Sequence, residues 1–386
     1  MAPSRLRPEL SSLGTTIFAE MSSLAVEHGA INLGQGFPDL DGPEEIKAVA
    51  IDAINAGRNQ YPPGIGIPEL RQAIASHQRR MYGMEWSPET DVLVTAGATE
   101  AIAAAILALV SPGEEVVLME PFYDAYYAAT LIAGGSPRAV RLRGTDFSLD
   151  PEELRSQVSG KSRVIVLNNP HNPSGKVFTR EELLQVAAVA EEFNLVVLAD
   201  EVYEHLIFEG SHLHFASLPG MRERTISISS MAKSFSLTGW KIGWATGPAN
   251  LVSAVKATKQ FLTYVNGAPF QPAAAFALDN AERLVPEVRE PLRAQRDLLA
   301  KGLASLGFNL HPCNATYFVI SDLGPATSTD SRRFCLDLIE RAGVAAIPTS
   351  AFYLGAEAPV EVRWTFSKQR ATLAEALDRL GRVKEW

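Results

Sequence analysis

Short apolar runs that end in polar, sequence-specific segments recur along this chain, and this pattern constrains the fold more than any other feature. The runs alternate with longer stretches of helical periodicity, which is typical of a parallel sheet covered by helices. Strands are expected at Val92–Thr95, Glu115–Met119, Arg163–Leu167, Leu195–Ala199, Thr225–Ser229 and Ile242–Thr246. Helices are expected at Glu100–Val110, Tyr123–Ala133, Arg180–Phe193 and Leu251–Leu262. The sequence therefore predicts an α/β fold.

The pattern changes after residue 280. The length of 386 residues exceeds what a single core usually serves, about 250–300 residues, so two domains are expected. Further helices are predicted at Ala281–Leu306, Asp330–Ala342 and Ala371–Val383, with strands at Ala315–Ile320 and Glu361–Ser367. We expect a large domain at 46–280 and a small α+β domain at 281–386. Residues 1–45 would form an N-terminal arm and part of the small domain.

Charge and composition exclude several classes of protein. The formal net charge of −9 disfavours a nucleic-acid partner, which requires a basic face. Two cysteines cannot build a disulfide framework, and no apolar run reaches the ~18 residues of a membrane span. The start lacks the apolar segment of a secretory signal, so a cytoplasmic protein is expected. His212 and His214 lack a third ligand nearby in the sequence, so we expect a surface loop there and no metal site.

Polar segments follow the expected strands at one edge of the sheet, where α/β proteins bind ligands. These segments are Gly97-Ala98-Thr99, Asn168–Gly175, Asp200–Tyr203 and Ser230–Lys233. Each alone has an ordinary explanation, such as a helix cap, a turn or a surface lysine. Together, a lysine amine, a carboxylate, a phenol and a phosphate cradle are what pyridoxal phosphate needs. The lysine would hold the cofactor as a Schiff base, and the carboxylate would keep its pyridine nitrogen protonated.

At this point the sequence resembles a known family, the fold-type I, class I/II aminotransferases. The resemblance rests on GATEA (97–101), PFYDAY (121–126), NNPHNPSG (168–175), ADEVYEHL (199–206), SISSMAKSFSLTGWKIGW (227–244) and EVRWTFSK (361–368). It covers nearly the whole chain. INLGQGFPD (31–39) is closest to the kynurenine/glutamine transaminase and methionine aminotransferase branch, and the chain is also similar to actinobacterial N-succinyldiaminopimelate aminotransferases. The resemblance implies a large, mostly parallel seven-stranded α/β/α domain and a smaller α+β domain.

The resemblance also implies a role for each cofactor residue. Lys233 would be the Schiff-base lysine and the base that moves the substrate proton. Asp200 would pair with the pyridine nitrogen, Tyr203 and Asn172 would reach the phenolic oxygen, and Tyr123 would stack on the ring. The phosphate would be held by Ala98, Thr99, Ser230 and Lys241. Relatives often have arginine in place of the last residue, but the kynurenine-type branch has lysine.

The substrate and the partner subunit are assigned in the same way. Arg363 and Asn172, with the Gly36 backbone, would bind the substrate α-carboxylate, since a guanidinium matches a carboxylate bidentately. Phe18 would either cover the substrate or pack as a buried anchor of the N-terminal arm. Tyr61 would reach the phosphate of a neighbouring subunit, which implies a homodimer with shared sites.

The implied reaction is a ping-pong transfer of an amino group from an L-amino acid to a 2-oxo acid such as 2-oxoglutarate. Residues 263–271 contain no arginine for a distal carboxylate, which disfavours a strict aspartate enzyme. Methionine, glutamine, aromatic amino acids, kynurenine and N-succinyl-diaminopimelate remain open. A cysteine-conjugate β-lyase is the alternative, because it begins with the same deprotonation. A nicotinamide enzyme is rejected, because neither GQG (34–36) nor GIG (64–66) completes G-x-G-x-x-G.

Overall fold

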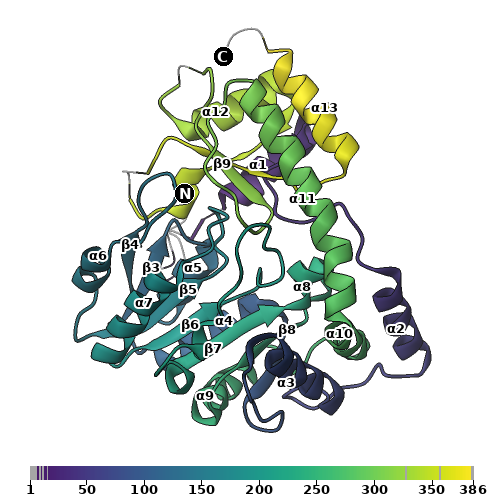
Figure 1. Ribbon diagram of the computed structural model, residues 1–386, viewed down its shortest axis with the longest axis vertical. Helices are drawn as coiled ribbons and strands as arrows, with labels where there is room; N and C mark the ends of the chain where they lie inside the picture. Colours follow the sequence, from purple (N-terminus) through teal and green to yellow (C-terminus); the bar gives the residue numbers. More distant parts are fainter. Residues whose placement is uncertain are drawn as a thin grey trace.

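The computed structural model describes residues 7, 10, 13, 14, 16–326, 328–355 and 358–383. Its centre is a seven-stranded sheet with the strand order β2-β8-β7-β6-β5-β3-β4 (Figure 1). The strands are β2 (Val92–Thr95), β3 (Glu115–Glu120), β4 (Ser136–Arg141), β5 (Ser162–Asn168), β6 (Val196–Asp200), β7 (Thr225–Ser230) and β8 (Gly243–Thr246). Only β8 runs antiparallel to its neighbours. The expected mostly parallel seven-stranded sheet is confirmed.

Helices cover both faces of this sheet because its strands are apolar on both sides. Val116, Leu118, Val164 and Val166 pack with α4 (Gly97–Leu109), α5 (Asp124–Ile132) and α9 (Ala249–Lys259). The alternate residues Val117, Met119, Ile165 and Leu167 pack on the other side with α6 (Pro151–Ser156) and α7 (Arg180–Glu192). Successive side chains of a strand point to opposite faces, so one continuous apolar run fills two cores.

The strand β4 was not among those expected from periodicity. It lies at the edge of the sheet beside β3; Ser136 and Arg138 are exposed, and Val140 is the one fully buried residue of the strand. An edge strand buries little, so its sequence, SPRAVR, carries too few apolar residues to be recognised. Among the other predicted strands of the sheet, the observed ends differ by no more than one residue.

A further helical group packs against β2 and β8 at the end of the sheet. It consists of α2 (Glu44–Asn55), α3 (Pro68–Tyr82) and α10 (Phe270–Asp279). Their core includes Ile74, Trp244 and several alanines of α10. The 25-residue helix α11 (Ala281–Ser305) then leads from this group to the smaller part of the molecule (Figure 1).

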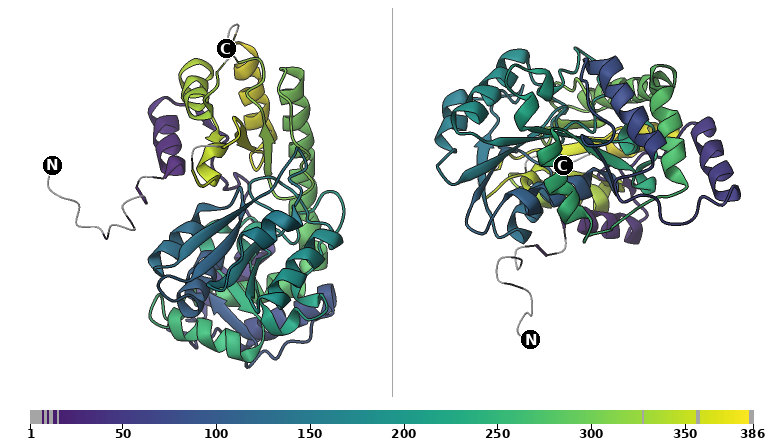
Figure 2. Two further views of the ribbon diagram at one scale, coloured as in Figure 1. Left: turned by 90° about the vertical axis from the view of Figure 1, so that its left-hand side faces the viewer. Right: turned by 90° about the horizontal axis from the view of Figure 1, so that it is seen from below.

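The smaller part combines the two ends of the chain. Strands β11 (Ile347–Pro348), β12 (Val362–Thr365) and β9 (Phe318–Ser321) form an antiparallel sheet. Strand β1 (Ile31–Asn32) pairs in parallel with β10 (Val344–Ala345), and α1 (Ile17–Glu27) packs beside them (Figure 1 and Figure 2). The helix expected at 330–342 is α12 (Ser331–Asp337) continued by a π-helical turn, and α13 is Arg370–Gly381.

Within the described residues, no helix is both long enough and apolar enough to cross a membrane.

Candidate active site

A cavity of about 430 Å³ lies at the carboxyl ends of β5, β6 and β7 and extends to β12 of the smaller part. All the residues predicted for the site line this cavity except Tyr61. They are Phe18, Gly36, Ala98, Thr99, Tyr123, Asn172, Asp200, Tyr203, Ser230, Lys233, Lys241 and Arg363. The parallel strands end at one edge, so side chains from distant segments converge there.

Asp200 ends β6 and is almost completely buried. One carboxylate oxygen accepts a hydrogen bond from Tyr126 Oη at 2.5 Å, and the other accepts one from the backbone N–H of Val202 at 3.3 Å. Burial raises the pKa of Asp200 to about 6, against the opposing effect of these hydrogen bonds. A buried carboxyl with a raised pKa favours a cationic partner inside the cavity.

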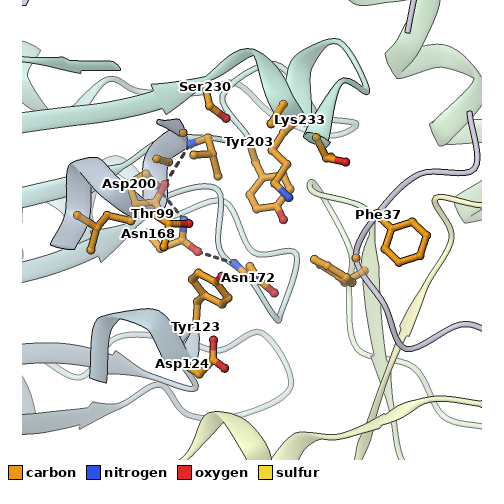
Figure 3. A pocket seen from close by; sticks show the side chains of 18 of the residues that line it. Phe37, Thr99, Tyr123, Asp124, Asn168, Asn172, Asp200, Tyr203, Ser230 and Lys233 are labelled. Atoms are coloured by element: carbon orange, nitrogen blue, oxygen red, sulfur yellow. Dashed lines mark hydrogen bonds between the residues drawn. The ribbon is translucent and has the colours of Figure 1, made fainter. Parts of the chain in front are cut away.

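Asn168 joins the ends of β5 and β6 and also holds Asn172 (Figure 3). Asn168 donates from Nδ2 to the carbonyl oxygen of Asp200 at 2.9 Å, and its Oδ1 accepts from the backbone N–H of Asn172 at 2.7 Å. The turn that begins with Asn168 is thereby fixed against the strand that carries Asp200. Asn172 is held at the cavity wall as a consequence.

The start of α4 offers a cradle for an anion. Gly97 has φ +75°, in the left-handed region that favours glycine, and it begins a 13-residue helix whose first N–H groups lack intrahelical partners. Thr99 and Ser230 bring hydroxyl groups to the same cavity. Lys241 Nζ lies 3.2 Å from where a Cβ atom on Gly97 would be, so its ammonium sits over this helix start. A helix N-terminus, hydroxyls and an ammonium together suit a phosphate.

Lys233 lies in the single helical turn α8 (Met231–Ser234), directly after β7. Its Nζ donates a hydrogen bond to Tyr317 Oη at 2.7 Å and lies 5.8 Å from the centre of the Tyr203 ring. Burial raises the pKa of the Tyr203 phenol well above its ordinary value, so this phenol stays protonated and can donate a hydrogen bond.

Arg363 projects from β12 and is buried beneath three aromatic rings. Its guanidinium donates to Asn172 Oδ1 at 3.0 Å and to the carbonyl oxygen of Gly34 at 2.8 Å. Burial lowers the pKa of Arg363 to about 10, which leaves it charged at neutral pH. Its Nε has no hydrogen-bond partner within the described residues. A buried guanidinium with an unused N–H is suited to bind a carboxylate.

Aromatic side chains form the wall beside this arginine. The Phe318 ring centre lies 3.8 Å from the guanidinium carbon of Arg363, and the Phe18 ring centre lies 5.3 Å from it. Phe18 also packs edge to face on Phe352, so it lines the cavity and anchors α1. A Cβ on Gly36 would come within 2.6 Å of Phe318 Cζ, which is why only glycine fits there.

Tyr61 lies outside this cavity in the single chain. Its side chain is 82% exposed and packs edge to face on Tyr264, with ring centres 5.7 Å apart. Phe261 and Leu262 are exposed beside Tyr264 in sequence. The loop that carries Tyr61 thus presents aromatic surface to the outside rather than to its own site.

The expected surface loop at His212 and His214 is wrong. Both side chains are buried, and His214 Nδ1 lies 2.6 Å from Glu201 Oε2. Glu201, His212 and His214 thus form one compact group, and His77, Glu204 and His205 form a second one, which is buried. The ring nitrogens of His77 and His205 already contact each other at 3.0 Å, so this closeness does not by itself indicate a metal. Sequence alone could not foresee this burial, because Glu201 comes from a different element.

Tyr126, Asn168 and Tyr317 contact the predicted residues but were not predicted themselves. Tyr126 follows Tyr123 by three residues, the spacing that places two side chains on one helix face. Asn168 is the last residue of β5 and could have been included for the same reason as Asp200. Tyr317 offered no signal, since it precedes β9 in an otherwise apolar run.

Comparisons with known proteins agree with this geometry. The family model described as aminotransferase class I and II matches residues 28–380. The N-succinyldiaminopimelate aminotransferase from Mycobacterium tuberculosis has 52% sequence identity and a TM-score of 0.95, covering 97% of this chain and 99% of that chain. The methionine aminotransferase of Escherichia coli is 37% identical over 96% of this chain and 97% of its own length. The kynurenine–oxoglutarate transaminase of Dictyostelium discoideum is 37% identical over 98% and 96%, respectively. The chain is therefore an enzyme that belongs to the class I and II aminotransferases.

Proposed function

We propose that this aminotransferase binds pyridoxal phosphate in the cavity and works by a ping-pong mechanism. An L-amino acid would leave its amino group on the enzyme and depart as a 2-oxo acid, and a second oxo acid such as 2-oxoglutarate would collect that group. Aminotransferases of class I and II are generally dependent on pyridoxal phosphate. The observation that carries the proposal is the convergence of Lys233, Asp200 and Arg363 on one cavity.

The cavity residues fit this cofactor. Asp200, whose pKa burial raises to about 6, would be stabilised as a carboxylate by a protonated pyridine nitrogen. Lys233 supplies the amine for a covalent link, and Tyr203 supplies a protonated phenol for the ring oxygen, with Asn172 beside it. Tyr123 would stack on the ring. The phosphate would be bound by the start of α4 and its neighbours, Ala98, Thr99, Ser230 and Lys241.

The chain's own residues would divide the chemistry between them. When bound, the cofactor supplies a conjugated ring that accepts the electron pair of the broken Cα–H bond. Lys233 would take the proton from Cα and return it to the neighbouring carbon. Asp200 would hold a proton on the ring nitrogen, and Tyr126 would orient that carboxylate.

Arg363 would bind the substrate α-carboxylate together with Asn172 and the backbone at Gly36. The guanidinium is already oriented by Asn172 and Gly34, so little side-chain entropy is lost on binding. The aromatic wall of Phe18, Phe37 and Phe318 favours an apolar or aromatic substrate side chain. Methionine, glutamine, aromatic amino acids, kynurenine and N-succinyl-diaminopimelate are the donors that we propose to test.

We further propose a homodimer with shared sites, in which Tyr61 reaches the phosphate of the partner subunit. The exposed aromatic surface around Tyr61, Phe261 and Tyr264 supports this proposal, since large exposed apolar groups commonly mark interfaces. We also propose that residues 46–280 form the cofactor-binding domain. Residues 281–386, with part of 1–45, would then form the domain that closes over the substrate.

The proposal is tested by the visible absorption of the purified protein, before and after addition of single amino acids. Loss of the cofactor band with one donor, and its return with 2-oxoglutarate, would establish the transfer and identify the donor class. A protein that releases pyruvate from a cysteine conjugate without any acceptor would instead be a β-lyase. A protein that takes up no pyridoxal phosphate would contradict the whole proposal.

A further inference from the structure

Tyr317 contacts the amine on which the proposed reaction depends. Its side chain is completely buried, and its Oη accepts a hydrogen bond from Lys233 Nζ at 2.7 Å. The same hydroxyl donates to the carbonyl oxygen of Gly36 at 2.5 Å. A continuous chain of hydrogen bonds therefore runs from Lys233 through Tyr317 to the segment beside the proposed carboxylate site.

The direction of these hydrogen bonds matters for the chemistry of the lysine. A phenol has one proton to donate, and Tyr317 gives it to the Gly36 carbonyl, which can only accept. Tyr317 must then act as the acceptor toward Lys233, and the lysine must be the donor. When the amine is neutral, this arrangement fixes one of its N–H groups and leaves its lone pair free to take a proton.

The backbone at Thr316, directly before Tyr317, is strained, and this strain helps to set the orientation of the Tyr317 side chain. Thr316 has φ +69°, which is an outlier for a β-branched residue. The N–H of Thr316 donates to the carbonyl oxygen of Leu206 at 2.9 Å, and its Oγ1 accepts from the N–H of Phe318 at 3.2 Å. Leu206 follows Tyr203 on the same turn, so the turn after β6 also sets the course of the chain at Tyr317. Strain of this kind persists where the surroundings hold it, and it is concentrated at functional sites.

The position of the Tyr317 ring is fixed from several sides. The ring packs edge to face on Tyr203, with centres 5.3 Å apart, and against Phe318 at 4.7 Å. The backbone carbonyl oxygen of Tyr317 accepts hydrogen bonds from the Phe366 N–H at 3.0 Å and from Thr365 Oγ1 at 3.1 Å. Both donors lie at the end of β12, the strand that carries Arg363. Tyr317 thus connects Lys233 with the Gly36 segment and with β12, the two parts of the chain that form the proposed carboxylate site.

We propose that Tyr317 is the positioning residue for the free amine of Lys233. The inference rests on the proposed function of Lys233. When bound, the cofactor would accept the electron pair of the Cα–H bond, and the Lys233 nitrogen would take the proton and later return it to the cofactor carbon. Tyr317 holds that nitrogen in place during both transfers. Its link to Gly36 ties this position to the segment beside the substrate carboxylate.

The test compares Tyr317→Phe with Tyr353→Phe. Both keep the ring and remove one hydroxyl, and Tyr353 is buried but does not line the cavity. In Tyr317→Phe, the single-turnover rate with L-methionine should fall ~10- to 100-fold with a change in KM below ~3-fold, because a misplaced base slows the proton transfer. The isotope effect with Cα-deuterated methionine should rise. The rate at which the apoprotein combines with pyridoxal phosphate should fall ~10-fold, since the amine is no longer held. Tyr353→Phe should match the wild type in all these measurements.

The outcomes separate this inference from the proposed function. A wild-type apoprotein that does not combine with pyridoxal phosphate would overturn the role of Lys233 and the inference with it. A wild-type protein that combines and turns over, with Tyr317→Phe equal to it in isotope effect and both rates, would overturn the inference alone. If Tyr317→Phe only lowered the unfolding temperature of the apoprotein, the role would be structural and the inference would likewise be wrong.

Discussion

Tyr126 donates a hydrogen bond to the carboxylate of Asp200 at 2.5 Å, across 74 residues of sequence. The phenol is fully buried, and its pKa is raised well above the ordinary value by burial and by Asp200. It therefore remains protonated and can only donate to this carboxylate. The hydrogen bond opposes the effect of burial on Asp200 and orients it for a cationic partner.

The stability of the apoprotein should depend on pH through Asp200. Burial raises the pKa of Asp200 from its ordinary value of 3.8 to about 6, so between these pH values the folded state binds more protons than the unfolded state. The free energy of unfolding should therefore fall as pH rises from 4 to 6, by up to about 3 kcal/mol from this group. The free energy of unfolding of Asp200→Asn should not fall in this way, so the difference between the variant and the wild type should shift in favour of the variant from pH 4 to pH 6. Urea unfolding at several pH values measures it, and Asp378→Asn on the exposed α13 should parallel the wild type. Equal pH profiles for wild type and Asp200→Asn would refute the assignment.

Replacing Lys233 with Ala should abolish turnover, because the chain would lose both the covalent link to the cofactor and the base. Pyridoxal phosphate should still bind noncovalently through the phosphate site. Absorption spectra and steady-state rates with L-methionine and 2-oxoglutarate test this, and Lys256→Ala on the exposed side of α9 is the matched control. Turnover retained by Lys233→Ala would exclude this lysine as the base.

Replacing Arg363 with Lys should mainly weaken substrate binding. A lysine keeps the charge but loses the planar fork, and it cannot reach Asn172 and Gly34 together. We expect KM for the amino donor to rise ~10- to 100-fold, with a smaller change in kcat. Arg382→Lys, on the exposed end of the chain, should leave KM unchanged. If KM were the same in Arg363→Lys as in the wild type, the carboxylate would bind elsewhere.

Replacing Tyr61 with Phe should weaken cofactor retention only if the sites are shared. The hydroxyl of Tyr61 does not line the cavity of its own chain, so any effect must come through a second copy. The dissociation constant for pyridoxal phosphate should rise ~10- to 100-fold, as expected for one lost hydrogen bond to a charged group. Equilibrium dialysis measures it, and sedimentation shows whether the dimer persists. An unchanged constant in a dimeric protein would remove the shared-site proposal.

Glu204 should be important for stability although it does not line the cavity. Its buried carboxylate accepts hydrogen bonds from Ser229 Oγ and Tyr82 Oη, and the nearby histidines His205 and His77 lower its pKa against the effect of burial. Glu204→Gln should reduce the free energy of unfolding by about 2–4 kcal/mol, since the two donors lose their charged acceptor. The exposed Glu375→Gln should cost below about 0.5 kcal/mol in the same urea titration. If Glu204→Gln lowered the free energy of unfolding by as little as Glu375→Gln does, the Glu204 carboxylate would not be a buried acceptor.

Local sequence determined most of the large sheet and most of the cavity. The apolar runs fixed the strands because both faces of a parallel sheet must be buried. The polar residues that follow β5, β6 and β7 were found because parallel strands end at one edge. The edge strand β4 was not predicted because it buries few apolar side chains. The pairing of β1 with β10 was not predicted because strands of two residues show no periodicity.

Tertiary structure alone decided which side chains meet across long sequence separations. Tyr317 lies 84 residues from Lys233, and its aim depends on strain at Thr316, which no local pattern reveals. His214 is buried because Glu201 from another element meets it, whereas its own sequence context is polar. Periodicity predicts on which face of its own helix or strand a side chain lies. The partner that it contacts depends on how the elements pack, and that follows from the burial of all of them at once.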